Sequence, residues 1–403
     1  MKILTLNTGS GSQQCSLFAL PDGPLPDEPL APVWEAKLDA TDPSQPAGKI
    51  VPRIRRGRET IEAEALDESS SAVERTQRLL SLLGDTGEIA AVGHRVVHGG
   101  ADFDRAVRVD AEVEAAIERF GAFAPLHHAA NLAGIRVARE VLGNKTPQIA
   151  VFDTAFHKTL APAAFTYAGP REWLARGIRR YGFHGTSFRW ASERAAQLLG
   201  RAGDRELRLI LCHLGGGCSL CATVGGRSID TTMGFTPLDG IAMSTRSGAV
   251  DPGILIYLMR EGATAGEIER TLNQESGLKG VSGLSGDTRI LSPRAAQGDP
   301  HAKLALDVFL HRLRAGIGQM LAALGTPPHA LVFTDAIAES EPALRAAACE
   351  TFAFLGLQLD AARNAASPLD ADLASEKSAV RILLIASREA WQIARECHAL
   401  ANA

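Results

Sequence analysis

The chain has 403 residues, 45% of them hydrophobic, and a formal net charge of −4 at pH 7. One hydrophobic core rarely serves so long a chain, so we expect two globular domains. The slightly acidic balance excludes the basic surface that nucleic-acid-binding proteins need, and no apolar run approaches the length of a membrane span. With no segment typical of a secretory signal, we expect a soluble, cytoplasmic protein whose partners are neither nucleic acid nor membrane.

The six cysteines are too sparse for a disulfide framework. Cys218 and Cys221 have the spacing of a metal-binding or redox pair. They stand alone, however, and in the strand expected there residues three positions apart point to opposite faces of the sheet. We therefore interpret both as small buried side chains, with metal ligation as the alternative.

The first expected element is an apolar segment, residues 3–20, that a Gly/Ser cluster interrupts. This pattern predicts two strands joined by a tight turn. Residues 21–58 carry many prolines and charges and predict loops with an edge strand, whereas residues 71–83 have the apolar spacing of a helix.

A buried strand is expected next, at residues 89–100, and it carries Arg95 near its middle. Burying an unpaired guanidinium is costly, so we expect Arg95 to emerge where an anion meets it. Pairing with a structural carboxylate is the alternative.

Helical spacing follows at residues 111–120 and 129–141, which leaves His127 at an expected junction between a loop and a helix. The apolar run at 148–157 predicts a strand that ends in the carboxylate of Asp153. The end of a sheet strand is a usual place for a reactive acid, although Asp is also common in turns.

His184 lies between two glycines before a helix expected at 190–199, so we expect it to be exposed on a loop. The N-terminal pattern then returns at residues 211–224, where three glycines at 215–217 interrupt an apolar run. Glycines can adopt positive φ and leave backbone N–H groups open to an anion such as phosphate, with a plain hairpin as the alternative. Two copies of one pattern predict two half-domains that face one site.

Residues 225–252 show little periodicity but are dense in Gly, Thr, Asp and Arg, which is typical of a functional loop. The remaining segments alternate between helix and strand. We expect mostly helix at 254–324, strand at 329–334, helix at 340–355, strand at 380–385, and a last helix from 387 to about 400.

Several ordered motifs resemble those of the acetate kinase family, within the superfamily of acetate and sugar kinases, actin and heat-shock chaperone ATPases. The resemblance covers essentially the whole length and is carried by residues 7–12, 93–100, 125–127, 151–157, 179–187, 233–238 and 245–248. It implies an α/β, actin-like ATPase fold of two duplicated domains, each with a mixed sheet flanked by helices, and a cleft between them. An N-terminal domain of residues 1–153 plus 387–403 would hold the acyl group and metal. Residues 154–386 would form the nucleotide side and the dimer interface.

The resemblance further implies reversible phosphoryl transfer between ATP and acetate or propionate, which yields acetyl phosphate and ADP and uses Mg²⁺ or Mn²⁺ in a homodimer. The residues implied as catalytic are Asp153, Arg95, Arg246, His184 and His127. The acyl carboxylate would meet Arg95, and the small pocket for its methyl group would consist of Val97, Leu126, Phe183 and Pro237. The implied metal-binding residues are Asn7 and Glu389. Those implied for the nucleotide and its phosphates are Ser12, Gln14, His213, Gly215, Gly216, Gly217, Asp287, Arg289, Ala336, Ile337 and Ala338.

The chain departs from the family pattern on the donor side. Gln14 stands where the family usually has Lys, and Gly216 where it has Asn. Ala336 and Ala338 replace two glycines of the loop near the adenine, and Asp335 precedes them. An acyl kinase that uses pyrophosphate or phosphate in place of ATP is therefore an alternative, and a non-catalytic sensor of acyl phosphate or nucleotide is another.

Overall fold

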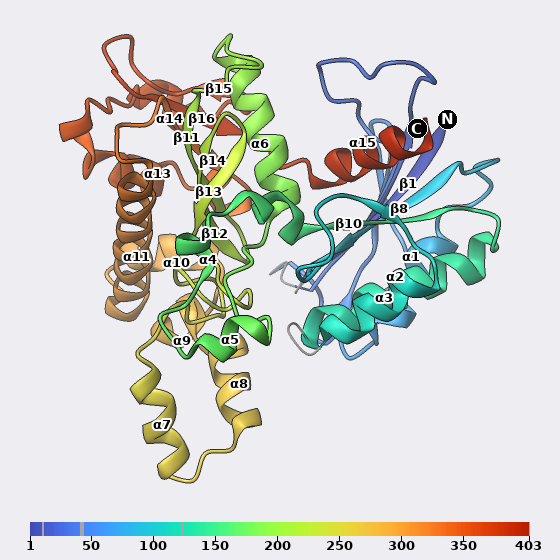
Figure 1. Ribbon diagram of the computed structural model, residues 1–403, viewed down its shortest axis with the longest axis horizontal. Helices are drawn as coiled ribbons and strands as arrows, with labels where there is room; N and C mark the ends of the chain where they lie inside the picture. Colours follow the sequence, from blue (N-terminus) through green and yellow to red (C-terminus); the bar gives the residue numbers. More distant parts are fainter. Residues whose placement is uncertain (10–11, 41–43, 122–124, 403) are drawn as a thin grey trace. The chain divides into compact units, whose positions relative to one another are not determined.

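The structure is a computed structural model that describes residues 1–9, 12–40, 44–121 and 125–402, with backbone alone over 125–128 (Figure 1). The chain forms two compact units. Unit 1 contains Met1–Phe156 and Arg388–Ala403, and unit 2 contains His157–Ser387. None of the helices in these ranges combines the length and apolarity needed to cross a bilayer.

Unit 1 is built on an eight-stranded mixed sheet with strand order β6-β5-β3-β2-β1-β8-β10-β9. These strands are β1 (Lys2–Thr8), β2 (Ser12–Ala19), β3 (Trp34–Asp39), β5 (Arg53–Arg56), β6 (Glu59–Glu62), β8 (Ala91–Val96), β9 (Val107–Arg108) and β10 (Gln148–Phe152). A small second sheet pairs β4 (Lys49–Ile50) with β7 (Leu66–Asp67). The helices are α1 (Ala72–Ser81), α2 (Ala111–Phe120), α3 (Pro125–Leu142) and α15 (Glu389–Ala401), and the 3₁₀ helix η2 (Asp153–Thr159) follows β10.

The central strands of this sheet are buried because helices cover both of its faces. β1, β8 and β10 run parallel to one another, and β10 is buried along its whole length. Helix α15 packs on β1 and β8 from one face, whereas α1 and α3 lie on the other (Figure 1). Parallel strands usually read as continuous apolar runs for this reason, which is why β8 and β10 could be predicted.

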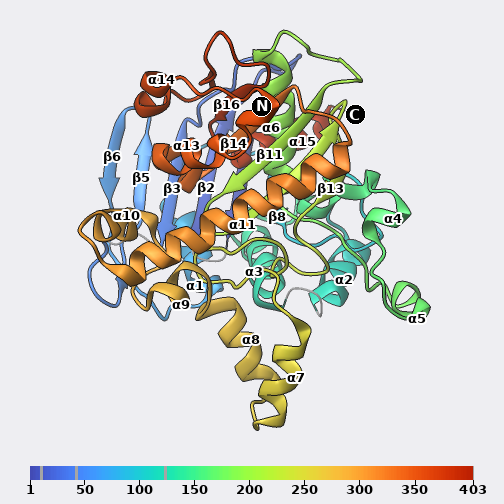
Figure 2. The ribbon, with the colours of Figure 1, turned by 90° about the vertical axis from the view of Figure 1, so that its left-hand side faces the viewer.

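Unit 2 is built on a six-stranded mixed sheet with strand order β13-β12-β11-β14-β16-β15. The strands are β11 (Arg208–Leu214), β12 (Cys218–Val224), β13 (Arg227–Thr231), β14 (Ala330–Thr334), β15 (Ala371–Asp372) and β16 (Arg381–Ile385). The helices are α4 (Pro162–Phe165), α5 (Arg171–Ala175), α6 (Gly185–Leu198), α7 (Pro252–Arg260), α8 (Ala265–Gln274), α9 (Gly277–Ser282), α10 (Thr288–Ala296), α11 (Pro300–Leu324), α12 (Ala336–Ser340), α13 (Pro342–Glu350), η3 (Ala353–Leu355) and α14 (Ala361–Ala366). Helix α6 packs on β11 and β16, and the long α11 packs on β12 and β13 (Figure 2). Helices α7 and α8 extend away from the rest of this unit in both views.

The two sheets repeat one topology. In each, three antiparallel neighbours (β3-β2-β1 and β13-β12-β11) are followed by two strands parallel to the last of them, and a short antiparallel strand closes the edge. The hairpins predicted at both glycine clusters are β1–β2 and β11–β12. This duplication confirms the predicted α/β fold of two related mixed-sheet domains.

Several local expectations were wrong. Helix α3 begins at Pro125, in keeping with the preference of proline for the first helical turn. His127 therefore belongs to that turn and not to a junction with a loop. Helix α6 begins at Gly185, five residues before the predicted start, and both α12 and β13 lie where no such element was expected.

Candidate active site

The predicted residues of unit 1 gather at the carboxyl ends of its parallel strands. Asn7 lies near the end of β1, Arg95 near the end of β8, and Asp153 directly after β10. Glu389 is the first residue of α15. Carboxyl ends of parallel strands are where open α/β sheets hold their ligands.

Arg95 and Asp153 form a buried ion pair. Nε of Arg95 donates to Oδ1 and Oδ2 of Asp153 at 3.1 and 3.0 Å, and Nη2 donates to Oδ2 at 2.6 Å. Asp153 is fully buried, and the Arg95 side chain is 10% exposed. Arg95 is therefore paired with a carboxylate, which was the alternative interpretation of this residue. The pairing fixes the plane of its guanidinium.

Asn7 connects this pair to Glu389. Its Nδ2 donates to Oε2 of Glu389 at 2.8 Å, and its Oδ1 accepts from Nη1 of Arg95 at 3.4 Å. Amide and carboxylate oxygens are the hard ligands that Mg²⁺ prefers, so this donor set fits that metal. Within the described ranges no cluster of three or more His, Cys, Asp or Glu could hold a metal by itself. A metal here would therefore need further ligands from substrate and water.

In the predicted phosphate turn of unit 2, glycine is needed because side chains lie close to the backbone, and not because the backbone takes unusual angles. None of the glycines at 215–217 has positive φ, contrary to expectation. A Cβ on Gly215 would clash with Oδ2 of Asp335, and one on Gly217 would stand 3.0 Å from Nη2 of Arg246 and 3.1 Å from Nε2 of His184. Three polar side chains thus lie against the backbone of this turn, which is why larger residues do not fit at 215 and 217.

His184 is buried, and its expected exposure on a loop was wrong. It takes a left-handed backbone conformation, with φ 57°, at the start of α6. Its ring stacks on that of His213 with centroids 4.1 Å apart. This stacking partner comes from β11, far away in the sequence, so the local motif gave no indication of it.

Two buried serines hold the two imidazoles. Nδ1 of His184 is hydrogen-bonded to Oγ of Ser219 at 2.8 Å, and Nδ1 of His213 to Oγ of Ser187 at 2.8 Å. Fixing Nδ1 sets the ring orientation, so that Nε2 of His184 lies at Gly217. Neither serine was predicted as a site residue.

Arg246 supplies a buried positive charge at the same turn. Its Nη1 donates to the carbonyl oxygen of Pro237 at 2.7 Å, which anchors one edge of the guanidinium in the glycine-rich loop. Together with the imidazoles of His184 and His213 it gives the turn a cluster of side-chain nitrogens, typical of an anion site.

The residues predicted for the acyl pocket belong to both units. Val97, directly after β8 in unit 1, is buried, as are Phe183 and Pro237 in unit 2. The side chains of Leu126 and His127 lie outside the described part of the chain.

The other predicted donor residues have intramolecular partners. Gln14 on β2 donates from Nε2 to Oε2 of Glu35 at 2.7 Å. Asp287 is the N-cap of α10 and forms an ion pair with Arg289 at 2.6 Å. Ser12 begins β2, and its carbonyl oxygen accepts from the backbone N–H of Gly9 at 2.8 Å.

The loop that carries Ala336, Ile337 and Ala338 is the short helix α12. Ile337 and Ala338 are buried, and α12 packs against β11 and β14. The loop expected to contact the adenine is therefore a short helix packed on two central strands of the sheet, one of which leads into the phosphate turn.

Cys218 and Cys221 are both buried free thiols. Burial raises the pKa of Cys218 to about 12 and that of Cys221 well above its ordinary range. Both thiols therefore stay protonated, as expected for buried small residues and not for metal ligands.

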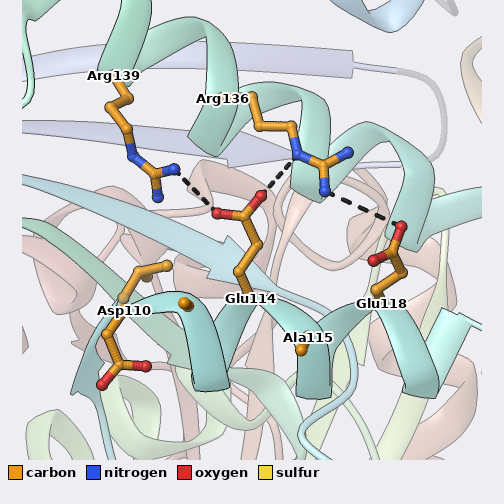
Figure 3. A pocket seen from close by; sticks show the side chains of 8 residues that line it. Asp110, Glu114, Ala115, Glu118, Arg136 and Arg139 are labelled. Carbon is orange, nitrogen blue, oxygen red and sulfur yellow. Dashed lines mark hydrogen bonds and ion pairs between the residues drawn. The ribbon is translucent and has the colours of Figure 1, made fainter.

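A surface hollow of about 450 Å³ lies between α2 and α3 in unit 1 (Figure 3). Glu114 accepts from Arg136 at 2.6 Å and pairs with Arg139 at 3.0 Å, and Glu118 faces Arg136 at 3.9 Å. These charged side chains of the hollow pair with one another, and the hollow contains no predicted site residue. We therefore assign no catalytic role to it.

The chain matches the model of the Acetokinase family over residues 2–395. It is 51% identical over 401 residues to a protein named acetate kinase from Gloeobacter violaceus, covering 98% of both chains. It is 49% identical over 409 residues to one from Acaryochloris marina, covering 99% of both.

Solved structures agree with these sequence matches. The crystal structure of a propionate kinase from Francisella tularensis has a TM-score of 0.85 at 35% identity, and that of Porphyromonas gingivalis acetate kinase 0.83 at 32%, each with 98% coverage of both chains. Sequence and structure lead to one conclusion: the chain belongs to the Acetokinase family.

Proposed function

We propose that the protein catalyses reversible, ATP-dependent phosphorylation of acetate or propionate to the acyl phosphate. The family assignment and the names of the relatives support this reaction. The observation that carries it is the cluster of side-chain nitrogens at the 215–217 turn, where Arg246 and His184 lie at Gly217 and His213 lies beside Asp335. Such a set suits the charge that a transferring phosphoryl group spreads over its oxygens.

In the forward reaction, a carboxylate oxygen of the acceptor forms a bond to the γ-phosphorus while the bond from phosphorus to the bridging oxygen of ADP breaks. The electron pair of that bond leaves with ADP. Because a carboxylic acid with a pKa of about 4.3 is ionised at neutral pH, the acceptor needs no general base. The side chains therefore position the reacting groups and neutralise their negative charge. Arg246 and His184 neutralise the migrating group.

Unit 1 supplies the residues for the acceptor and the metal. Arg95, oriented by Asp153, neutralises the acyl carboxylate, and Val97, Phe183 and Pro237 each keep their predicted role in binding the acyl methyl group. Asn7 and Glu389 would hold Mg²⁺ or Mn²⁺, which supplies charge neutralisation at the phosphates. Leu126 and His127 keep their predicted roles in acyl binding and catalysis.

Unit 2 supplies the residues for the donor. The phosphates would lie at 215–217 with His213, and the nucleoside beside α12 with Asp287 and Arg289. In unit 1, Ser12 and Gln14 are further predicted contacts. Pyrophosphate or phosphate stays the alternative donor, because Ala336 and Ala338 replace glycines beside the expected nucleoside and a smaller donor does not need the nucleoside contacts.

We also propose a homodimer that uses α7. No residue of this helix is buried, and Ile254, Ile256, Tyr257 and Met259 are 48–61% exposed. Several large apolar side chains exposed around one helix usually mark a protein interface. A cytoplasmic location stays a prediction from the sequence.

The test of the proposed function is whether acyl phosphate forms. The full chain is incubated with ATP, Mg²⁺ and acetate, and hydroxylamine traps acetyl phosphate as the hydroxamate. We expect ATP-dependent, acetate-dependent product. Nucleotide or acyl phosphate binding without any product would instead identify a sensor.

A further inference from the structure

Asp335 has a backbone conformation that glycine alone normally takes. It follows β14 directly, with φ 76° and ψ 172°. A side chain is strained in this region and persists there only when its surroundings enforce it. Such outliers cluster at functional sites, so the position of this carboxylate needs a physical account.

The conformation directs the carboxylate into the 215–217 turn. Oδ2 lies 3.4 Å from Nε2 of His213. The same oxygen occupies the space in which a Cβ of Gly215 would stand. The side chain is 28% exposed, so the carboxylate lies against the turn on one side and is open to solvent on the other.

An anion from the chain therefore occupies one end of an anion site. Arg246 and His184 lie at Gly217, whereas Asp335 covers Gly215 and pairs with His213. A phosphate chain that reaches His213 must displace the carboxylate or share the site with it. Two negative charges about 4 Å apart repel strongly where solvent is partly excluded.

We propose that Asp335 is a specificity-determining residue that competes with the phosphate chain of the donor for His213 and the Gly215 end of the turn. This inference rests on the proposed function, since it assumes that the donor phosphates bind at 215–217. It predicts that this chain binds its donor more weakly than a variant whose turn lacks the carboxylate of Asp335. The competing carboxylate also keeps weakly bound anions, such as inorganic phosphate, out of the turn.

The test measures binding of ADP and of pyrophosphate by titration calorimetry to the full chain and to Asp335→Asn, which keeps the shape and removes the charge. We expect binding about 5- to 20-fold tighter in the variant, as the loss of one partly screened charge near an anion implies. The difference should shrink as salt rises, because screening weakens the repulsion. Asp335→Gly, which also removes the strained side chain, should tighten binding at least as much.

Two control variants separate the local charge from other effects. Asp307→Asn removes one negative charge from the exposed surface of α11, where Asp307 pairs with Lys303, and should leave the dissociation constants unchanged. Asp335→Glu keeps the charge and should not tighten binding. Unchanged or weaker binding by both Asp335→Asn and Asp335→Gly would overturn the proposal. The carboxylate would then either have no effect on binding of the phosphates or contribute to it.

This measurement does not depend on turnover. If the chain makes no acetyl phosphate, the proposed function fails while the binding comparison still reports on Asp335. If acetyl phosphate forms but both variants bind ADP and pyrophosphate no more tightly, the proposed function stands and the role of Asp335 is refuted.

Discussion

Arg246 is anchored through Nη1 by the Pro237 carbonyl, and its Nη2 lies close to where a Cβ of Gly217 would stand. Because its charge is fixed where the phosphoryl group would pass, we expect Arg246→Ala to lower kcat by about 10² to 10⁴, as for other electrostatic donors. Arg246→Lys should recover little of this loss, since Lys cannot reproduce the planar pair of donors. Steady-state kinetics with ATP and acetate measure the effect.

Arg227, exposed on β13, provides the matched control. Arg227→Ala removes the same charge from the same unit and should leave kcat near the unmutated value. Near-normal kcat in Arg246→Ala would remove this residue from the catalytic set.

The strain at Asp335 has a consequence for stability. Relief of such a conformation is worth about 1–3 kcal/mol, against about 0.5–1 kcal/mol for the extra freedom of glycine in the unfolded chain. Asp335→Gly should therefore raise the free energy of unfolding by about 1 kcal/mol in urea titrations. A lower free energy of unfolding would show that the contact with His213 stabilises the fold by more than the strain costs.

Single residues were predictable where a motif and a strand end coincided. Asp153 lies directly after β10, as expected, whereas Arg95, expected near the middle of its strand, lies near the end of β8. The burial of His184 was not predictable, because it depends on stacking with His213 from a distant strand.

At the scale of elements, the β11–β12 hairpin has room for a side chain at one position. A Cβ on Gly216 would meet no atom within 4 Å, so Gly216→Asn is sterically permitted. The family usually has Asn there, and an amide donor to a phosphate contributes about 0.5–1.5 kcal/mol. We expect Gly216→Asn to lower KM for ATP by about 2- to 10-fold.

Gly216→Ala serves as the control, because it adds the Cβ without the amide. It should leave KM for ATP unchanged. Equal changes in KM for both variants would mean that the backbone, and not the amide, is responsible.

Regular elements could be predicted where their burial leaves a regular pattern of apolar residues in the sequence. The parallel strands read as continuous apolar runs, and α2 has its predicted bounds. Short elements were missed for lack of periodicity. Helix α12 has five residues, and β13 has five, of which two are buried. Neither length is enough to establish a helical or alternating pattern.

At the scale of the whole molecule, two buried histidines make stability depend on pH. His94 pairs with Gln148, and His157 lies between Ser228 and the Phe183 carbonyl. Burial lowers the pKa of each to about 4. Both are therefore neutral in the folded chain at pH 6, whereas in the unfolded chain their pKa is about 6.5.

Because the folded pKa lies below the unfolded one, the unfolded chain binds more protons in acid. This contribution to stability is present in full above pH 6.5 and is lost as the pH falls toward 4, by up to about 3 kcal/mol for each histidine. Urea unfolding between pH 7.5 and 4.5 measures it. His94→Gln should flatten the dependence, whereas His311→Gln, on the exposed side of α11, should not; a flat profile in the unmutated chain would contradict this prediction.

The duplicated architecture was the part of the whole molecule that could be predicted from the sequence. Two glycine hairpins in distant parts of the chain indicated a repeat, and the strand orders of both sheets agree with it. The packing of α15 on β1 and β8 could be expected only from the resemblance, because it brings together residues from opposite ends of the chain.

The most direct test of the central claim follows the oxygen atoms. Acetate labelled with ¹⁸O in both carboxylate positions is incubated with the protein, Mg²⁺ and ATP, with pyrophosphate in a parallel reaction, and the product is read by ³¹P NMR. Phosphoryl transfer to the carboxylate predicts ADP and acetyl phosphate in equal amounts from ATP, with ¹⁸O bonded to phosphorus. Acetyl phosphate without ¹⁸O on phosphorus, or product from pyrophosphate and none from ATP, would contradict the account.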